Sequence, residues 1–144
     1  MILLPPDLRF SLRANDLAHR AADRDEKPAP DPLPVVKFFN PVGAATWLAT
    51  ELGADGDTLF GLADLGFGCP ELGVFSLAEL AAVRLPLGMG IERDVGFVTA
   101  DPLSVWAAWA RRAGSISAAE QAFRRLARTA NDELPPPLDD EGGG

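Results

Sequence analysis

The sequence contains a single cysteine, no signal peptide and no apolar run long enough to cross a membrane. Cys69 has no second cysteine to pair with, so no disulfide can form within the chain and we expect a reducing compartment. A membrane-spanning helix needs about 20 consecutive apolar residues, and a signal peptide needs a basic start before an apolar stretch. Since neither pattern occurs, we expect a cytoplasmic protein without a membrane partner.

Basic residues are also scarce. Lys and Arg number 13 against 21 Asp and Glu, which gives a net charge of −8. Phosphate contacts need a basic surface, so direct nucleic-acid binding is not expected. Between Phe38 and Val83 there is no Lys or Arg at all, and a sheet built from this stretch should carry a negative field without local counter-charge. The stretch holds six carboxylates, namely Glu51, Asp55, Asp57, Asp64, Glu71 and Glu79.

The remaining composition is that of an ordinary globular protein, with 47% hydrophobic residues among 144. We expect one domain over residues 1–132, opened by a helix from Pro5-Pro6-Asp7 to about Arg24. Four prolines in residues 23–34 predict a linker after that helix. Residues 133–144 are rich in Pro, Gly and acidic side chains, which predicts a disordered tail.

Short apolar runs separated by Gly and Asp turns predict the strands. They occupy residues 35–39, 44–52, 58–65 and 90–98, with a glycine-rich segment at 66–73, and GADGD is expected to join the second and third in a hairpin. Three later helix starts are expected at the capping box of Ser76, at Asp101 before Pro102, and at the capping box of Ser117. Hairpin-length connections indicate an α+β fold, with a mainly antiparallel sheet of about five strands and helices packed on one face.

Carboxylates within or beside the apolar runs are the leading candidates for catalysis. A small metal-dependent hydrolase or nuclease could use Glu51, Asp64, Glu71 and Asp94, because oxygen ligands suit Mg²⁺, Mn²⁺ or Ca²⁺. No two of them have a diagnostic metal spacing, and we expect no metal and no cofactor. In the structural alternative, Asp64 and Glu71 accept backbone amides in the glycine turn, and Arg93 forms an ion pair with one of them.

Two surfaces are candidates for binding a protein. An acidic sheet surface would consist of Asp55, Asp57, Asp64, Glu71, Arg93 and Trp47. A basic patch on the last helix, which could also be a solvated face, would receive an acidic partner, a second copy or nucleic acid, and consists of Arg124, Arg125 and Arg128. Trp106 and Trp109 are three apart on one helix and are expected to face the core. We expect Phe67 to pack in a tight loop between Gly66 and Gly68.

Three segments together resemble the bacterial domain-of-unknown-function family numbered 2958. They are PVVKFFNPVGAATWLATEL, DTLFGLADLGFGCPELGVFSLAEL and IERDVGF, and the resemblance covers roughly Met1 to Arg112. It implies a small stand-alone protein of plasmids and integrative elements, often encoded near anti-restriction and transfer functions, and it carries no established activity.

The leading hypothesis is a non-enzymatic protein-interaction module of a mobile element. It would act against a host defence complex through the acidic sheet surface, with a protein partner whose identity the sequence does not reveal. The sequence also allows the protein to associate with a second copy of itself. The metal-dependent hydrolase or nuclease is the alternative.

Overall fold

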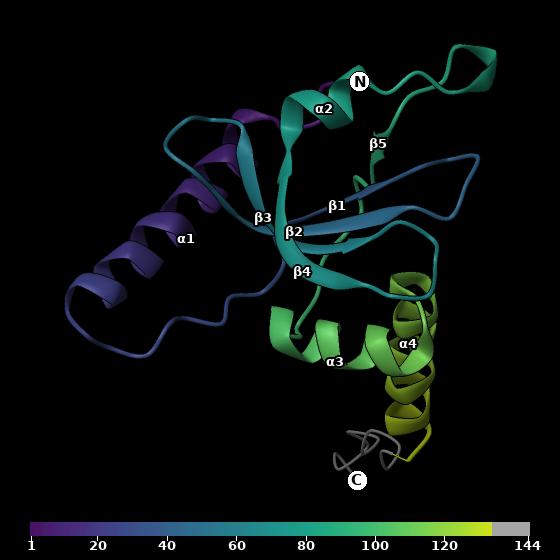
Figure 1. Ribbon diagram of the computed structural model, residues 1–144. Coiled ribbons are helices and arrows are strands. Elements are labelled where there is room, and N and C mark those ends of the chain that lie inside the picture. The colour runs from purple at the N-terminus through teal and green to yellow at the C-terminus, as the bar shows by residue number, and fades with distance from the viewer. Residues whose placement is uncertain (134–144) are drawn as a thin grey trace, which may run out of the picture.

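The computed structural model describes residues 1–133 and contains a five-stranded antiparallel sheet in the order β4-β3-β2-β1-β5 (Figure 1). The strands are β1 (Val36–Phe39), β2 (Thr46–Leu52), β3 (Thr58–Asp64), β4 (Glu71–Ser76) and β5 (Glu92–Arg93). The helices are α1 (Pro6–Arg24), α2 (Leu77–Ala82), α3 (Leu103–Ala113) and α4 (Ile116–Glu133), with a short 3-10 turn η1 (Pro86–Gly88). The α+β class and the antiparallel sheet are confirmed. Glu133 belongs to α4, and the rest of the predicted tail lies outside the described residues.

The hairpin of β2 and β3 forms the centre of the sheet, as its sequence predicts. A β-bulge between Ala49 and Glu51 shifts the register of the pair, and bulges of this kind bend a strand and increase its twist. Gly61 lies opposite Ala49. A Cβ at Gly61 would come within 1.8 Å of the carbonyl oxygen of Leu48. This close approach of two backbones explains why the strand contains a glycine at a buried position.

Helices cover both faces of the sheet rather than the single face that we expected. Neighbouring side chains of a strand point to opposite faces, and β2 is buried along its whole length. Trp47 packs with Leu12 of α1 on one face. Leu48 packs with Trp106 of α3 and Ile116 of α4 on the other. Trp106 therefore faces the core, as predicted, and Trp109 packs against the same cluster.

The predicted starts of the last three helices are partly right. Ser76 is the N-cap of α2, and its Oγ accepts a hydrogen bond of 3.1 Å from the amide of Glu79. The helix start predicted at Asp101 is wrong, because α3 begins at Leu103 with Pro102 as N-cap. The start predicted at Ser117 is also wrong. α4 begins at Ile116, and Ser115 Oγ accepts from the amide of Ala118 at 3.0 Å.

At each of these three helix starts, the carboxylate of an aspartate that is distant in the sequence accepts a backbone amide. Asp57 Oδ1 accepts the amide of Ala78 in α2 at 2.7 Å. Asp31 Oδ1 accepts the amide of Ser104 in α3 at 3.1 Å. Asp64 Oδ2 accepts the amide of Ile116 in α4 at 2.9 Å. A negative charge at a helix N-terminus satisfies free amides and complements the helix dipole, so these aspartates fasten the helices to the sheet and to the segment before β1.

Candidate functional site

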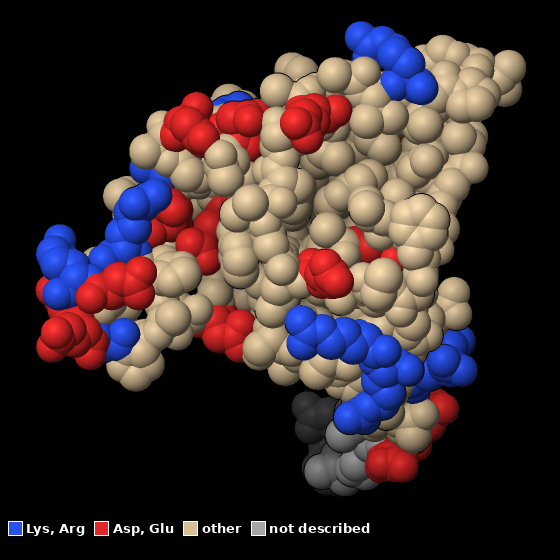
Figure 2. All heavy atoms as spheres, viewed as in Figure 1, with Lys and Arg blue, Asp and Glu red and all other residues tan. Residues whose placement is uncertain are grey.

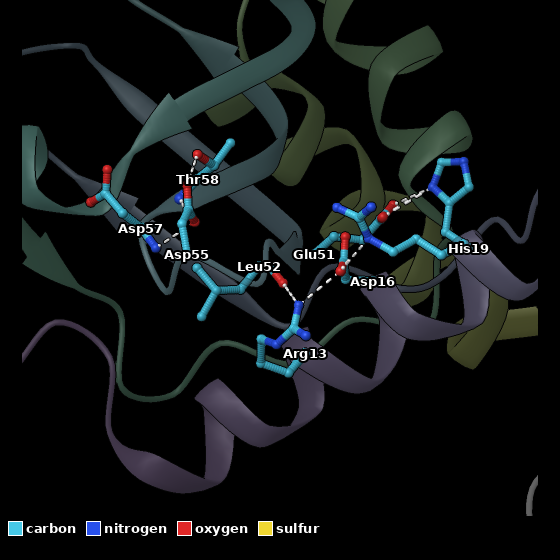
Figure 3. Close-up of polar contacts among 9 residues, drawn as sticks. Arg13, Asp16, His19, Glu51, Leu52, Asp55, Asp57 and Thr58 are labelled. Atoms are coloured by element: carbon cyan, nitrogen blue, oxygen red, sulfur yellow. Dashed lines mark hydrogen bonds and ion pairs between the residues drawn. The ribbon is translucent and has the colours of Figure 1, made fainter.

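The acidic end of β2 contacts α1 through two carboxylate clusters (Figure 3). The Nδ1 of His19 lies 3.0 and 3.2 Å from the two oxygens of Glu51. Asp16, which is buried, accepts from Arg13 at 2.7 Å and from Arg20 at 3.0 Å. α1 thus supplies Glu51 with a hydrogen-bonding partner, while the arginines pair with Asp16 of the same helix. Arg13 also donates to the carbonyl oxygen of Leu52 in β2 at 2.7 Å.

The turn between β2 and β3 is held by its own carboxylates (Figure 3). Asp55 accepts the hydroxyl of Thr58 at 2.6 Å and the amides of Asp57 and Thr58 at 2.9 and 2.8 Å. These bonds, with that from the Thr58 hydroxyl the largest cause, lower the pKa of Asp55 to about 2. Asp57 accepts the hydroxyl of Ser76 at 2.8 Å as well as the amide that begins α2. Both residues reach the surface, but their oxygens already stabilise the fold.

Asp64 and Trp47 are buried and cannot belong to an open binding surface. Asp64 is 1% exposed. Its Oδ1 accepts the amide of Gly66 at 2.9 Å, which is the structural role that the glycine turn suggests, and its second oxygen holds α4. Trp47 lies in the core between the sheet and α1. The predicted acidic sheet surface is therefore not one continuous patch.

The remaining predicted residues also lie apart. Arg93 donates to the carbonyl oxygens of Ile2 and Leu3 at 2.8 and 3.2 Å, so the predicted ion pair with Asp64 or Glu71 is wrong. Glu71 is exposed at the start of β4. The carboxylate of Asp94 lies 3.7 Å from the amine of Lys37. On α4, Arg124 pairs with Glu120 at 2.7 Å, and Arg125 and Arg128 are exposed.

The four carboxylates proposed for a hydrolase do not converge. Glu51 and Asp64 lie at opposite ends of the β2–β3 ladder, opposite Phe60 and Thr46 respectively. Throughout residues 1–133, no three His, Cys, Asp or Glu side chains are grouped so that they could hold a metal ion. The geometry therefore offers no support for the hydrolase alternative.

An open apolar surface on β4 is the feature that the sequence analysis missed. Phe67, which we expected to pack within its loop, is 83% exposed, and Val74 is 70% exposed. Leu72 and Val74 lie opposite Leu62 and Phe60 of β3. α3 and α4 cover Leu62 but leave the outer strand open. We call this surface the β4 face, and it consists of Leu65, Phe67, Leu72 and Val74.

Most charged side chains lie around the β4 face. Figure 2 shows a broad surface over β4 that is largely uncharged but includes an acidic group, with further acidic groups toward α2 and basic groups toward α3 and α4. Glu71, the first residue of β4, is exposed. The strand itself carries no charge from Leu72 to Ser76. The only sequence signal for this arrangement was the run of uncharged residues after Glu71, which fits a buried strand equally well.

β4 also presents free backbone groups, because it is the outer strand of the sheet. At the opposite edge, β5 is only two residues long and Arg93 ties it to the N-terminal segment. Lysine, proline and bulges commonly protect an edge strand from pairing. β4 has none of these within Leu72–Ser76, and its register with β3 is continuous. β4 begins with the charged Glu71 directly after Pro70, so the part of this edge that is free of such protection is Leu72–Ser76.

Residues 3–117 match the model of a family described as protein of unknown function (DUF2958), so the chain belongs to this family. No curated protein and no solved structure matches the chain. The match ends just after the start of α4 and includes the whole sheet and the β4 face. Among the helices of the described residues, none has the length and apolar character needed to cross a membrane.

Proposed function

We propose that this protein is a non-enzymatic protein-interaction module and that it binds through the β4 face. One observation carries the proposal: four exposed apolar side chains lie on and beside an unprotected edge strand. Contiguous exposed apolar surface in a soluble protein marks interaction sites. Edge strands bind partners by adding a strand to the sheet, in which the main chain supplies affinity and alternate side chains supply specificity.

The positions of the carboxylates support a role that is not catalytic. Glu51 contacts His19, Asp64 holds two backbone amides, and Asp94 lies beside Lys37. Each of them thus has a partner within the fold. A catalytic site needs several such groups converging on one point, whereas these stabilise separate contacts.

The family resemblance supports a narrower setting for the same proposal. In this setting the protein serves a bacterial mobile element and counteracts a host defence complex. This setting rests on the resemblance to the family and not on the chemistry of any site in the structure. The net charge of −8 suits a basic partner, since complementary charge accelerates association.

Photocrosslinking in cells tests whether the β4 face binds a protein. A benzoylphenylalanine residue would replace Phe67 or Val74 in the full chain, expressed in bacterial cells. Phe10 of α1 is the matched control, because it is an aromatic residue that is 76% exposed. We expect irradiation to produce covalent protein adducts from positions 67 and 74 but not from position 10. The absence of adducts at both β4 positions would overturn the proposed function.

A further inference from the structure

We infer that the β4 face binds a second copy of this chain, by antiparallel pairing of β4 with β4 of the partner. The inference rests on the proposed function, because it names the occupant of the same surface. The resulting dimer would contain one continuous sheet that crosses the interface. The backbone groups and the side chains of β4 both support this arrangement.

The backbone groups at the free edge belong to the residues with exposed apolar side chains. The amide of Leu77 donates to the carbonyl oxygen of Asp57 at 3.0 Å. In an antiparallel ladder, hydrogen-bonded pairs alternate with pairs that are not bonded. The amides and carbonyls of Leu72, Val74 and Ser76 therefore point away from β3. A partner strand would meet main-chain groups and apolar side chains at the same positions.

Antiparallel pairing about a two-fold axis at Gly73 places Leu72 of each copy opposite Val74 of the other. In this register both members of each pair have free backbone groups, and all four side chains lie on one face. Apolar cross-strand pairs of this kind stabilise a sheet. No atom lies within 4 Å of the position that a Cβ would take at Gly73, so the centre of the strand is open. In a shifted register, with Val74 opposite Val74 of the other copy, Leu72 would instead lie opposite Ser76.

Acidic groups lie at both ends of β4. Asp57 and Glu79 lie at the end that leads into α2, and Glu71 is exposed at the first residue of the strand. Arg111 and Arg112 belong to α3, which packs on the opposite face of the sheet from α2. The choice of a second copy therefore rests on the self-complementary register about Gly73 and not on charge.

Sedimentation equilibrium of the full chain, from micromolar to submillimolar concentration, tests the inference. We expect the wild-type protein to reach twice the 15.3 kDa chain mass. Val74→Lys should remain monomeric, because each lysine would lie opposite Leu72 of the other copy and diagonal to the second lysine, and a lysine on an edge strand opposes pairing. Val42→Lys is the matched control, since Val42 is 52% exposed in the turn between β1 and β2, and it should dimerise as wild type does. A monomeric wild-type protein, or a dimeric Val74→Lys variant, would overturn the inference.

The chain's own cysteine provides a second measurement that needs no substitution. Cys69 is exposed and lies four residues before Gly73. Cys69 lies two residues before the first residue of β4. With Cys69 and Pro70 extended along the strand direction, eight residues at about 3.3 Å each would separate the two cysteines by about 26 Å. Nitroxide labels on Cys69 should give a dipolar distance of about 20–35 Å once label length is included. A distance outside this range would exclude the β4 pairing even for a protein that dimerises.

The outcomes of the two tests separate the inference from the proposed function. A monomeric purified protein that still forms adducts with another protein from positions 67 and 74 would refute the second copy and keep the interaction role. Adducts of doubled chain mass, together with a dimer in solution, would support both. A monomer that forms no adducts would overturn both.

Discussion

Replacing Asp64 with asparagine provides the sharpest test of how the acidic residues act. The side chain is 1% exposed and joins two places that are 50 residues apart, the amides of Gly66 and Ile116. Asparagine has nearly the same shape, so the substitution leaves no cavity. It has one acceptor oxygen, however, and its amino group would face a backbone amide that also needs an acceptor.

The expected loss of stability follows from those two contacts. A hydrogen bond to a charged group contributes about 1.5–3 kcal/mol, and a negative charge at a helix N-terminus contributes about 0.3–1 kcal/mol. Asp64→Asn should therefore lower the free energy of unfolding by about 2–4 kcal/mol. For a chain of this length, this corresponds to a Tm lower by about 5–15 °C.

Urea denaturation and thermal melting, both followed by circular dichroism, measure this difference. Glu71→Gln is the control, because it neutralises an exposed carboxylate near the same loop and should change stability by less than about 0.5 kcal/mol. Equal stability of Asp64→Asn and wild type would refute the capping role. Higher stability would suggest a carboxylate kept for function, since removal of such groups commonly stabilises a protein.

Three further predictions concern the sheet, the turn and α4. Gly61→Ala should destabilise the protein by about 3 kcal/mol or more in urea denaturation, because the new Cβ would overlap a carbonyl of β2; a loss below 1 kcal/mol would contradict this. The pKa of Asp55, about 2 in the folded protein, should rise toward 3.8 in Thr58→Val when followed by NMR. Because the folded pKa is lowered, the stabilisation from this carboxylate is present above pH 4 and is lost as the pH falls toward 2. Ser115→Ala should cost about 1 kcal/mol, whereas Ser117→Ala should cost much less; the reverse order in thermal melts would restore the start predicted from sequence.

Local patterns were sufficient to predict α1, the β2–β3 hairpin and the start of α2. They did not predict β4, and the strand expected over residues 90–98 is only Glu92–Arg93. Pro6 and Asp7 indicated the start of α1, and the structure confirms a helix to Arg24. The GADGD turn indicated the hairpin of β2 and β3, and the capping box at Ser76 indicated the start of α2. Each of these signals comes from residues close together in the chain, where backbone preference and side-chain bonding act within one turn.

These local patterns could not predict contacts between segments that are far apart in the sequence. α3 and α4 begin next to Asp31 and Asp64, which lie 73 and 52 residues away, so no local motif could indicate either contact. The exposure of Phe67 depends on where α3 and α4 cross the sheet, because they cover β2 and β3 but not the loop before β4. An apolar strand at an edge and an apolar strand in the middle have the same sequence pattern.

The internal bonds of the aspartates change how the acidic stretch should be understood. Read from sequence, a run of carboxylates without Lys or Arg suggests a binding surface. In the structure, Asp57 and Asp64 accept helix amides, and Asp55 closes a turn. A nearby lysine would compete with those amides for the same oxygens, so the scarcity of basic residues between positions 38 and 83 is consistent with capping alone. Once these three aspartates are assigned to the fold, the apolar edge from Leu72 to Ser76 still lacks a structural explanation, and the protein partner that we propose would supply it.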